Sequence, residues 1–581
     1  MIKLSDYVFD FIASKGIDTV FTVSGGGCMH LIDSLGKNKH LKYICNHHEQ
    51  ASAMAAEGYA RVTNKPGCVL VTTGPGGTNA LTGVLCAYQD SIPIIIISGQ
   101  VPSDQLSNRT GCRQIGQQEF NIIDTVKTMT KYAVIINDKN TIRYHLEKAY
   151  HIATTGRPGP VWIDIPLDIQ SSIIDIKQQK GYTPRKKKNL LNFYYFNKLQ
   201  KLLQNSKKPV VVVGGGIRAS NTVNKLQEFL NKTNLPVMTG PHSGVDVVNT
   251  DYGYYAGRFG LLGQYTSNHL IQDSDLIICL GSRLNPKMTG YDASKFAPNA
   301  KKIIIDIDKH EIKKLKFKKI GWNIDLNDFF DYVNPKIITP EITNWQNEIK
   351  IKRAKEKLVL EKHETLTDYV STYVFSKKLE KILDKDSIIV TSDGTAHVVP
   401  LKTINLKHKQ RLFSNEGTAP MGYGLPAAIG AYYGSKTPII CIEGDGSIMM
   451  NIQELETVRH HNIPLKLFII NNEGYLSIKL TQKSFFKGNL IASEISSGVS
   501  IPSFNKIADV FGFQYHSVRS NKQIDSILDK VFNNNDPTII EIFTDPNEQH
   551  EPKVIAKGID KNGKIIPGEL TDMFISDVFN L

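Results

Sequence analysis

The segment PIICIEGDGSIMM, residues 438–450, shows the pattern that decides the fold: an apolar run, a glycine-rich turn and the start of a helix. Two earlier segments repeat it, with CVLVTT before GPGGTN at 68–79 and PVVVV before GGGIRAS at 209–220. Each turn precedes an amphipathic stretch and a second apolar run. Continuous β-branched runs are typical of strands that are buried on both faces. We therefore predict an α/β protein with three doubly wound parallel-sheet domains.

Polar connectors separate these three blocks. Residues 177–192 (KQQKGYTPRKKKNLLN) are basic, and residues 335–364 are charged and helix-prone. At about 150 residues per domain, the chain length suits three or four domains. We expect domains over residues 1–180, 190–335 and 365–545, and a tail over 546–581.

Composition and charge exclude several classes of protein. Hydrophobic residues make up 41% of the 581 residues and charged residues 22%, which excludes a disordered or fibrous chain. Lysine and arginine exceed aspartate and glutamate by 69 to 56, a net charge of +13. This excess is dispersed and is not interleaved with aromatic residues as in a nucleic-acid groove, so we expect no nucleic-acid partner.

The sequence also argues against a membrane or secreted protein. The longest apolar run, 92–97, contains Pro93 and is too short to span a bilayer. Asp6 and Asp10 lie where a signal peptide would have its apolar core. The seven cysteines form no CxxC pair, which indicates reduced thiols and no zinc site. We expect a cytoplasmic protein.

Two motifs in the last third of the chain predict a magnesium site: GDGS around Asp445 and NNEG around Asn472. Each ends a predicted strand, so both side chains should meet at one edge of the sheet. A carboxylate, an amide oxygen and the Gly474 carbonyl form a hard-oxygen ligand set, which suits Mg²⁺. Gly446 and Ser447 open the next helix, whose N–H groups suit a diphosphate. A lone GDG would be only a turn.

A further motif, HEQASAMAAEGYAR, places Glu49 between the apolar run YIC and an alanine-rich helix. A glutamate here is favourable near the helix N-terminus, so one interpretation of Glu49 is a helix cap. Aspartate would cap equally well, so capping explains neither why this residue is a glutamate nor why it lies within this motif. Glu49 is therefore a candidate catalytic carboxylate.

Taken together, these motifs resemble the thiamine-diphosphate (ThDP) enzymes of the acetolactate synthase-like superfamily. The resemblance covers nearly the whole chain, and is nearest to carboligases of branched and O-antigen sugar pathways. It implies pyrimidine-binding, central and diphosphate-binding domains, and a homodimer or homotetramer with the active site across the subunit interface. The matching segments are HEQASAMAAEGYAR, TTGPGGTNALTGV, GRPGPVWIDIP, VVVGGGI, IIDIDKHEI, MGYGLPAAIGA and GDG…NN.

The resemblance assigns roles to individual residues. Glu49 matches the glutamate that hydrogen-bonds the aminopyrimidine ring and shares a proton with it. Met421 matches the apolar residue that holds the cofactor in a bent form. Asp445, Asn472 and the Gly474 carbonyl would bind Mg²⁺. Residues matching the rest of the ThDP site are Thr73, Gly74 and Pro75 on the pyrimidine side, and Gly394, Thr395, Gly446 and Ser447 on the diphosphate side.

Two more residues are candidates for catalysis. Gln118 matches the glutamine of the AFQE motif of acetolactate synthases. His30 follows the glycine loop SGGGC, beside the expected thiazolium, where it would relay a proton to a forming alkoxide. A histidine packed on a helix face is the alternative interpretation of His30.

The positions that bind the acceptor in acetolactate synthases differ together in this chain. The aromatic residue before that glutamine is replaced by Gln117, and the MHG turn matches 261–263, Leu-Leu-Gly. The arginine that holds an acceptor carboxylate matches Lys287, which lacks the bidentate fork. The tryptophan after the NN motif matches Thr481. These changes predict a different acceptor, and neutral drift is the alternative.

The implied function is that of a ThDP- and Mg²⁺-dependent carboligase. It would decarboxylate a 2-oxo acid, pyruvate above all, and transfer the two-carbon unit to an aldehyde or ketone, keto-sugar nucleotides included. The alternatives are a true acetolactate synthase catalytic subunit, a non-ligating decarboxylase or lyase, and a non-catalytic scaffold, which the intact cofactor positions disfavour. The tail resembles that of the sugar-pathway group, and we predict that it closes over the site.

FAD is a separate question. Acetolactate synthases hold a flavin without redox use on the central domain, and the matching residues here are Gly214, Gly215, Gly216, Arg157, Asp306 and Asp308. VVVGGGI and GRPGP also occur in relatives without FAD, and Arg157 has an alternative role as a turn residue. The sequence leaves both outcomes open.

Overall fold

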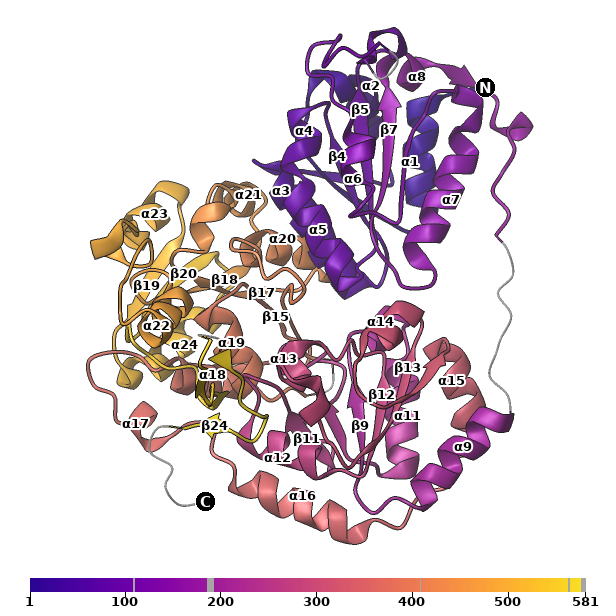
Figure 1. Ribbon diagram of the computed structural model, residues 1–581. Coiled ribbons are helices and arrows are strands. Elements are labelled where there is room, and N and C mark those ends of the chain that lie inside the picture. Colours follow the sequence, from indigo (N-terminus) through magenta and orange to yellow (C-terminus); the bar gives the residue numbers. More distant parts are fainter. Residues whose placement is uncertain (108–109, 185–192, 408, 563–564, 576–581) are drawn as a thin grey trace.

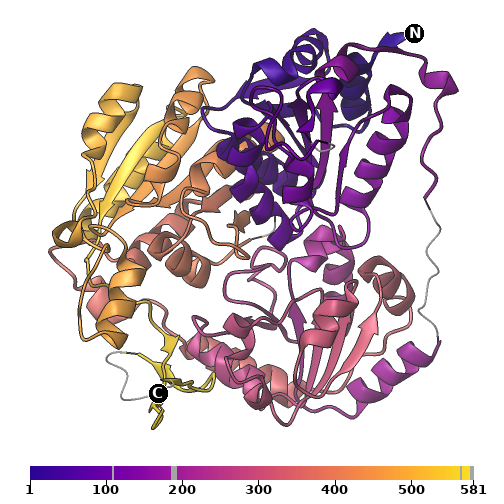
Figure 2. The same cartoon turned by 45° about the horizontal axis from the view of Figure 1, so that its top comes forward.

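The computed structural model describes residues 1–107, 110–184, 193–407, 409–562 and 565–575. It contains three six-stranded sheets whose strands all run parallel. Each sheet lies between helices in a lobe of its own (Figures 1 and 2), so the predicted three doubly wound α/β domains are confirmed. The expected domain limits stay predictions; part of the first connector, 185–192, and the end of the tail, 576–581, lie outside the described residues.

The N-terminal sheet has the strand order β3-β2-β4-β5-β7-β6. Its strands are β2 (Thr19–Thr22), β3 (Lys42–Cys45), β4 (Gly67–Val71), β5 (Ile94–Gln100), β6 (Tyr132–Ile135) and β7 (Val161–Pro166). Its helices are α1 (Leu4–Ser14), α2 (Met29–Lys37), α3 (Glu49–Thr63), α4 (Pro75–Asn79), α5 (Leu81–Asp90), α6 (Ile122–Val126), α7 (Ile142–Thr154) and α8 (Leu167–Ser171). Strands β4 and β5 are buried throughout, which explains their unbroken apolar runs. A short antiparallel pair, β1 (Ile2–Lys3) and β8 (Ile173–Ile174), joins the two ends of this domain.

The central sheet has the order β11-β10-β9-β12-β13-β14. Its strands are β9 (Pro209–Val213), β10 (Val237–Thr239), β11 (Tyr255–Arg258), β12 (Leu276–Leu280), β13 (Lys301–Asp306) and β14 (Ile320–Asn323). Its helices are α9 (Phe193–Gln204), α10 (Gly216–Ala219), α11 (Val223–Thr233), α12 (Tyr265–Asp273), α13 (Pro286–Thr289), α14 (Lys309–Lys314) and α15 (Leu326–Val333). Helices α16 (Thr343–Lys355) and α17 (Glu361–Glu364) then lead to the last domain.

The C-terminal sheet has the order β16-β15-β17-β18-β20-β19. Its strands are β15 (Ile388–Thr391), β16 (Arg411–Phe413), β17 (Ile439–Gly444), β18 (Leu465–Asn471), β19 (Gln514–Val518) and β20 (Thr538–Phe543). Its helices are α18 (Thr372–Ile382), α19 (Thr395–Thr403), α20 (Gly424–Ser435), α21 (Glu454–His460), α22 (Leu476–Phe485), α23 (Phe504–Phe511) and α24 (Ile524–Phe532). Among the described residues, no helix has both the length and the hydropathy needed to cross a bilayer.

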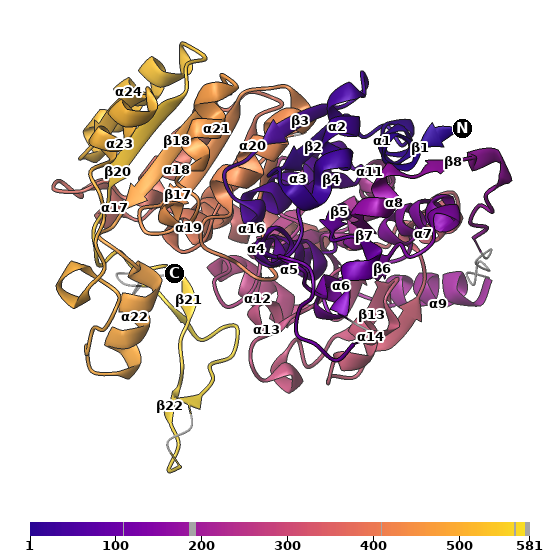
Figure 3. The ribbon, with the colours of Figure 1, turned by 90° about the horizontal axis from the view of Figure 1, so that it is seen from above.

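The N-terminal and C-terminal domains share one hydrophobic core through α3 and α20, which lie side by side (Figure 3). A Cβ on Gly58 of α3 would lie 2.1 Å from the carbonyl oxygen of Ala427, and a Cβ on Gly430 of α20 would lie 1.8 Å from that of Ala55. No side chain fits at either position. The two glycines therefore allow the backbones of the helices to touch.

The central domain is attached to the C-terminal end of α19. Arg258, at the end of β11, is 1% exposed and its guanidinium donates to the carbonyls of Leu401 and Ile404. Gln264 Nε2 donates to the carbonyl of Lys402 at 2.9 Å. These carbonyls belong to the last turn of α19, where helix carbonyls have no partner of their own and a cation is favourable. One end of α19 is thus fixed by the central domain.

The tail packs against the same part of the central domain. It contains two short antiparallel pairs, β21 (Lys553–Val554) with β24 (Met573–Phe574) and β22 (Gly558–Ile559) with β23 (Ile565–Ile566). Val554 N donates to the Leu261 carbonyl at 2.8 Å, and Asn268 Nδ2 donates to that of Leu570 at 2.8 Å. Leu570 itself is buried in the central core. Closure of the tail over a site stays a prediction.

Candidate active site

Asp445 organises the loop after β17. It is 1% exposed, and its Oδ1 accepts from Gly446 N at 2.7 Å. Its Oδ2 accepts from the N–H groups of Asn472 and Gly474, both at 3.1 Å. Because β17 and β18 are parallel neighbours, their loops meet at the carboxyl edge of the sheet. The structure thus brings together the three residues proposed to bind a metal.

The oxygen atoms in this loop pair have the chemistry of a Mg²⁺ site. Asn472 Oδ1 is buried and has no hydrogen-bond partner among the described residues, so it is free to bind a cation. Burial raises the pKa of Asp445 to about 6, although the three backbone N–H groups and Lys479 act in the opposite direction. A nearby cation would favour the charged carboxylate. The residues present therefore fit the predicted ion.

Ser447 connects three loops at the same edge. Its Oγ shares a hydrogen bond of 2.7 Å with Ser392 Oγ, and it accepts from Gly422 N at 2.9 Å. Ser392 precedes the loop that contains Gly394, and Gly422 follows the half-buried Met421. The predicted diphosphate and Met421 segments are therefore adjacent to the predicted metal loop.

Gly394 and Thr395 form the start of α19. Gly394 has φ +57°, in the left-handed region that favours glycine, and it leads directly into the first helical residue. Thr395 Oγ1 shares a hydrogen bond of 2.9 Å with Nε2 of His550, which is buried in the tail. The N-terminal N–H groups of this nine-residue helix suit an anion.

Glu49 is the first residue of α3 and is 7% exposed. The helix cap is made by His48, whose Nδ1 accepts from Gln50 N at 3.1 Å. Glu49 Oε2 instead accepts from Asn79 Nδ2 at 3.0 Å, so the GPGGTN turn holds its carboxylate in place. The capping interpretation therefore does not account for the Glu49 side chain.

The residues proposed for the pyrimidine side lie close to Gln118. Gly74 has φ +63°, and a Cβ there would be 2.2 Å from the Gln118 carbonyl oxygen. Thr73 Oγ1 donates to the Gly99 carbonyl at 3.1 Å, and Pro75 begins α4. The structure thus joins Thr73, Gly74, Pro75 and Gln118. In the described part of this single chain, no hydrogen bond links Glu49 to the Asp445 loop.

His30 is the second residue of α2 and is half-buried. Burial lowers its pKa, and the positive charge of Lys3 lowers it further. The loop before it contacts the predicted pyrimidine side, because Gly27 N donates to Thr72 Oγ1 at 3.2 Å. Proton relay by His30 stays a prediction.

Among the residues expected on the acceptor side, two are in contact with each other, and two others are exposed on different domains. Lys287 and Leu261 are adjacent, since Leu261 N donates to the Lys287 carbonyl at 2.7 Å. Lys287 Nζ forms an ion pair with Glu416 Oε1 at 3.1 Å. Gln117 and Thr481 are exposed, on the N-terminal and C-terminal domains respectively.

Arg157 and Asp306, both considered for FAD, each contact Asp308. Arg157 pairs with Asp308 at 3.1 Å and with Glu311 at 2.8 Å, which links the N-terminal and central domains. Asp306 is 9% exposed, its Oδ1 accepts from Asp308 N, and burial raises its pKa to about 6. These contacts account for Arg157 without a flavin, because two carboxylates already neutralise its charge.

The glycine turn of the central domain, residues 214–216, can likewise be explained without a flavin. A Cβ on Gly214 or on Gly216 would lie within 2.7 Å of the Gly281 backbone, so both glycines are required for packing. At Gly215 the nearest atom would be Ser243 Oγ at 3.9 Å, so this position has open space. The turn alone does not indicate a bound flavin.

Sequence reasoning missed three residues of this region. Asn79 ends the GPGGTN motif, so its position in that motif was an available signal. Ser392 lies two residues before Gly394, and Glu416 lies five residues before Met421, but neither belongs to a pattern with a known chemistry. Their importance follows from contacts with Ser447 and Lys287, which lie far away in the sequence.

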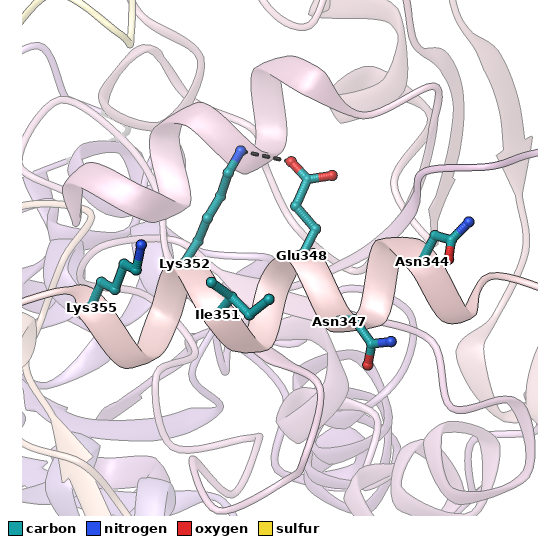
Figure 4. Close-up of a pocket in the computed structure, with 6 residues that line it drawn as sticks. All are labelled: Asn344, Asn347, Glu348, Ile351, Lys352 and Lys355. Carbon is teal, nitrogen blue, oxygen red and sulfur yellow. Dashed lines mark ion pairs between the residues drawn. The ribbon is translucent and has the colours of Figure 1, made fainter.

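A shallow hollow along α16 does not belong to this site. The residues that line it are Asn344, Asn347, Glu348, Ile351, Lys352 and Lys355 (Figure 4). Lys352 and Glu348 form an ion pair of 2.7 Å at i,i+4 spacing, as on a solvated helix face.

Comparisons with known proteins agree with this geometry. Three family models match the chain: "Thiamine pyrophosphate enzyme, N-terminal TPP binding domain" over residues 2–127, "central domain" over 196–332, and "C-terminal TPP binding domain" over 393–542. The chain is 30% identical to the acetolactate synthase isozyme 2 large subunit of Escherichia coli, over 95% of this chain and 97% of that protein. It is 29% identical to the chloroplastic acetolactate synthase of Arabidopsis thaliana, over 98% of this chain and 85% of that protein. The chain belongs to the thiamine pyrophosphate enzymes, and within that family it is an acetolactate synthase-like, ThDP-dependent enzyme.

Proposed function

We propose that this protein is a Mg²⁺- and ThDP-dependent carboligase of the acetolactate synthase type, acting as a catalytic subunit. Its donor is pyruvate, and its acceptor is a second 2-oxo acid. The names of its relatives support this acceptor. The observation that carries the cofactor chemistry is the pairing of Asp445 with Asn472, whose amide oxygen is buried without a partner.

Each part of the site has a distinct task. Asp445, Asn472 Oδ1 and the Gly474 carbonyl hold Mg²⁺, while the N–H groups near Thr395 and Ser447 hold the diphosphate. Bound ThDP supplies an electron sink for the bond that breaks when carbon dioxide leaves. The Glu49 carboxylate, held by Asn79, shares a proton with the ring nitrogen of the cofactor.

The assembly we propose is a homodimer or homotetramer. Glu49 contacts its own N-terminal domain, and in the assembly it faces the diphosphate-binding domain of another subunit. FAD on the central domain and a cytoplasmic location remain predictions. No part of the proposed reaction requires a flavin.

An aldehyde or ketone acceptor, such as a keto-sugar nucleotide, is the second candidate. One observation favours it: Lys287, which matches the acceptor-carboxylate arginine, already pairs with Glu416 at 3.1 Å. The carboxylate of a 2-oxo acid would have to compete with that glutamate. A neutral carbonyl compound has no carboxylate to place and avoids this competition.

Product analysis separates the candidates. The full chain with Mg²⁺ and ThDP is incubated with pyruvate alone, then with pyruvate and 2-oxobutyrate or an aldehyde, and the products are identified by mass. Acetolactate as the main product supports the first candidate, and an acetylated aldehyde supports the second. Release of carbon dioxide and acetaldehyde alone would identify a non-ligating decarboxylase. Turnover that persists in Glu49→Gln would contradict the assigned site.

A further inference from the structure

Two histidines and a glutamate from separate parts of the chain meet between the central and C-terminal domains. His242 lies in the loop after β10, His397 lies in the first turn of α19, and Glu416 follows β16. The histidines are 5% and 4% exposed. Glu416 N donates to Asp90 Oδ2 at 3.0 Å, so the N-terminal domain also positions this cluster.

The distances within the cluster suit a metal ion. Glu416 Oε2 lies 3.1 Å from His397 Nε2 and 3.6 Å from His242 Nδ1. One ligand atom from each of the three residues lies within 4.8 Å of the others. In a tetrahedral zinc site with bonds of 2.0–2.1 Å, ligand atoms are about 3.3 Å apart. The first two separations lie on either side of this value.

Hydrogen bonding leaves part of the cluster unexplained. Both ring nitrogens of His242 and Nδ1 of His397 are buried without a hydrogen-bond partner among the described residues. Buried nitrogen atoms without a partner are destabilising, so something else is expected to occupy this position.

The second oxygen of the glutamate is also held. Lys287 Nζ contacts Glu416 Oε1 at 3.1 Å, while Oε2 faces the histidines. Outer contacts of this kind commonly fix the orientation of a ligating carboxylate. Lys287 is half exposed, so water screens its charge from an ion on the other side of the carboxylate.

We propose that His242, His397 and Glu416 form a second metal site, for a divalent transition metal such as Zn²⁺, with a fourth position open to water or to an oxygen of a ligand. Two imidazoles and one carboxylate favour such a metal over Mg²⁺, which prefers oxygen ligands. Three protein ligands and one open position are typical of zinc sites that exchange a bound molecule. None of its ligands belongs to the Asp445 loop, and it is inferred without use of the proposed function. Its ligands include no cysteine, so the expectation of no zinc site, which was based on the cysteines, does not bear on it.

Cobalt binding tests the site, because tetrahedral Co²⁺ has intense visible bands. The full chain is stripped with a chelator, saturated with Mg²⁺ and ThDP, and titrated with Co²⁺ and then Zn²⁺. We expect about one Co²⁺ per chain with tetrahedral bands, and its displacement by Zn²⁺. Absence of these bands in the wild-type protein would overturn the proposal, whatever the variants do.

Variants locate the bound ion. Loss of outer-shell contacts already weakens metal binding roughly 10- to 100-fold, so His397→Gln and Glu416→Gln should each weaken it by at least that much. Two controls should bind Co²⁺ as the wild type does: Asp445→Asn, in the Mg²⁺ loop, and His363→Gln. His363 is also buried, but its Nδ1 accepts from Leu360 N at 3.1 Å. Unchanged affinity in folded His397→Gln and Glu416→Gln, with circular dichroism as the folding check, would overturn the proposal.

Discussion

Replacing Asp445 by asparagine keeps the shape of the side chain but removes its charge and one hydrogen-bond acceptor. In the wild type, three backbone N–H groups donate to this carboxylate. We expect a modest loss of stability without cofactor, and a much larger loss of the stabilisation that Mg²⁺ and ThDP confer. The second effect reports on the metal site itself.

The size of this effect follows from linkage. At ThDP about 100 times above the wild-type Kd, binding stabilises the fold by about 2.7 kcal/mol. A charge-assisted contact contributes about 1.5–3 kcal/mol, so its loss weakens binding roughly 13- to 160-fold. At the same ThDP concentration, the cofactor would then raise the free energy of unfolding of the variant by only about 0.3–1.3 kcal/mol.

Thermal unfolding with and without Mg²⁺ and ThDP measures this gain. The matched control is Asp164→Asn, since Asp164 is 1% exposed and accepts from Ser98 Oγ at 2.6 Å and from Gln100 Nε2 at 3.0 Å. Asp164 lies in β7, so its variant should keep the full gain from the cofactor. If Mg²⁺ and ThDP stabilise the Asp445→Asn protein as much as they stabilise the wild type, the metal assignment is refuted.

Three further substitutions test other parts of the structure. Glu49→Gln should keep cofactor-dependent stabilisation but lose most pyruvate turnover in a carbon dioxide assay, because an amide cannot share the ring proton; near wild-type turnover would contradict this role. Arg258→Met should cost about 2–4 kcal/mol and lower the unfolding temperature, because two buried carbonyls of α19 lose their donors; an unchanged temperature would contradict the attachment described. Burial raises the pKa of Glu548 to about 7, so the folded chain holds this proton more tightly than the unfolded chain, and stability falls as pH rises from about 4.5 to 7. In Glu548→Gln this fall in stability should be absent. The measurement is the difference in unfolding temperature between the variant and the wild type at about pH 5 and at about pH 8; an equal difference at both would show that Glu548 does not titrate in this range.

The sequence predicted those features that depend on local pattern. The buried strands were recognisable because parallel sheets need unbroken apolar runs. Asp445 and Asn472 were paired correctly in space because both follow strands of the same sheet, whose carboxyl ends face one edge. The roles of these residues in catalysis remain predictions.

Features that depend on contacts between domains were not predictable from the sequence. His242 and Glu416 belong to different domains, and no spacing rule connects them. Arginine side chains usually lie on the surface, but Arg258 is buried because the carbonyls of α19 accept its hydrogen bonds. The tail was predicted to close over the site, and its packing on Leu261 depends on a turn whose shape the sequence does not specify.

The close contact of α3 and α20 affects how the chain folds during synthesis. Gly424, which begins α20, follows Thr63, which ends α3, by 361 positions. At about 5–20 residues per second, the ribosome takes roughly 20–70 s to cover this distance. Throughout that interval the alanine-rich face of α3 has no α20 to pack against. The newly made N-terminal domain therefore has to exist without the packing partner of α3 until the last third of the protein emerges.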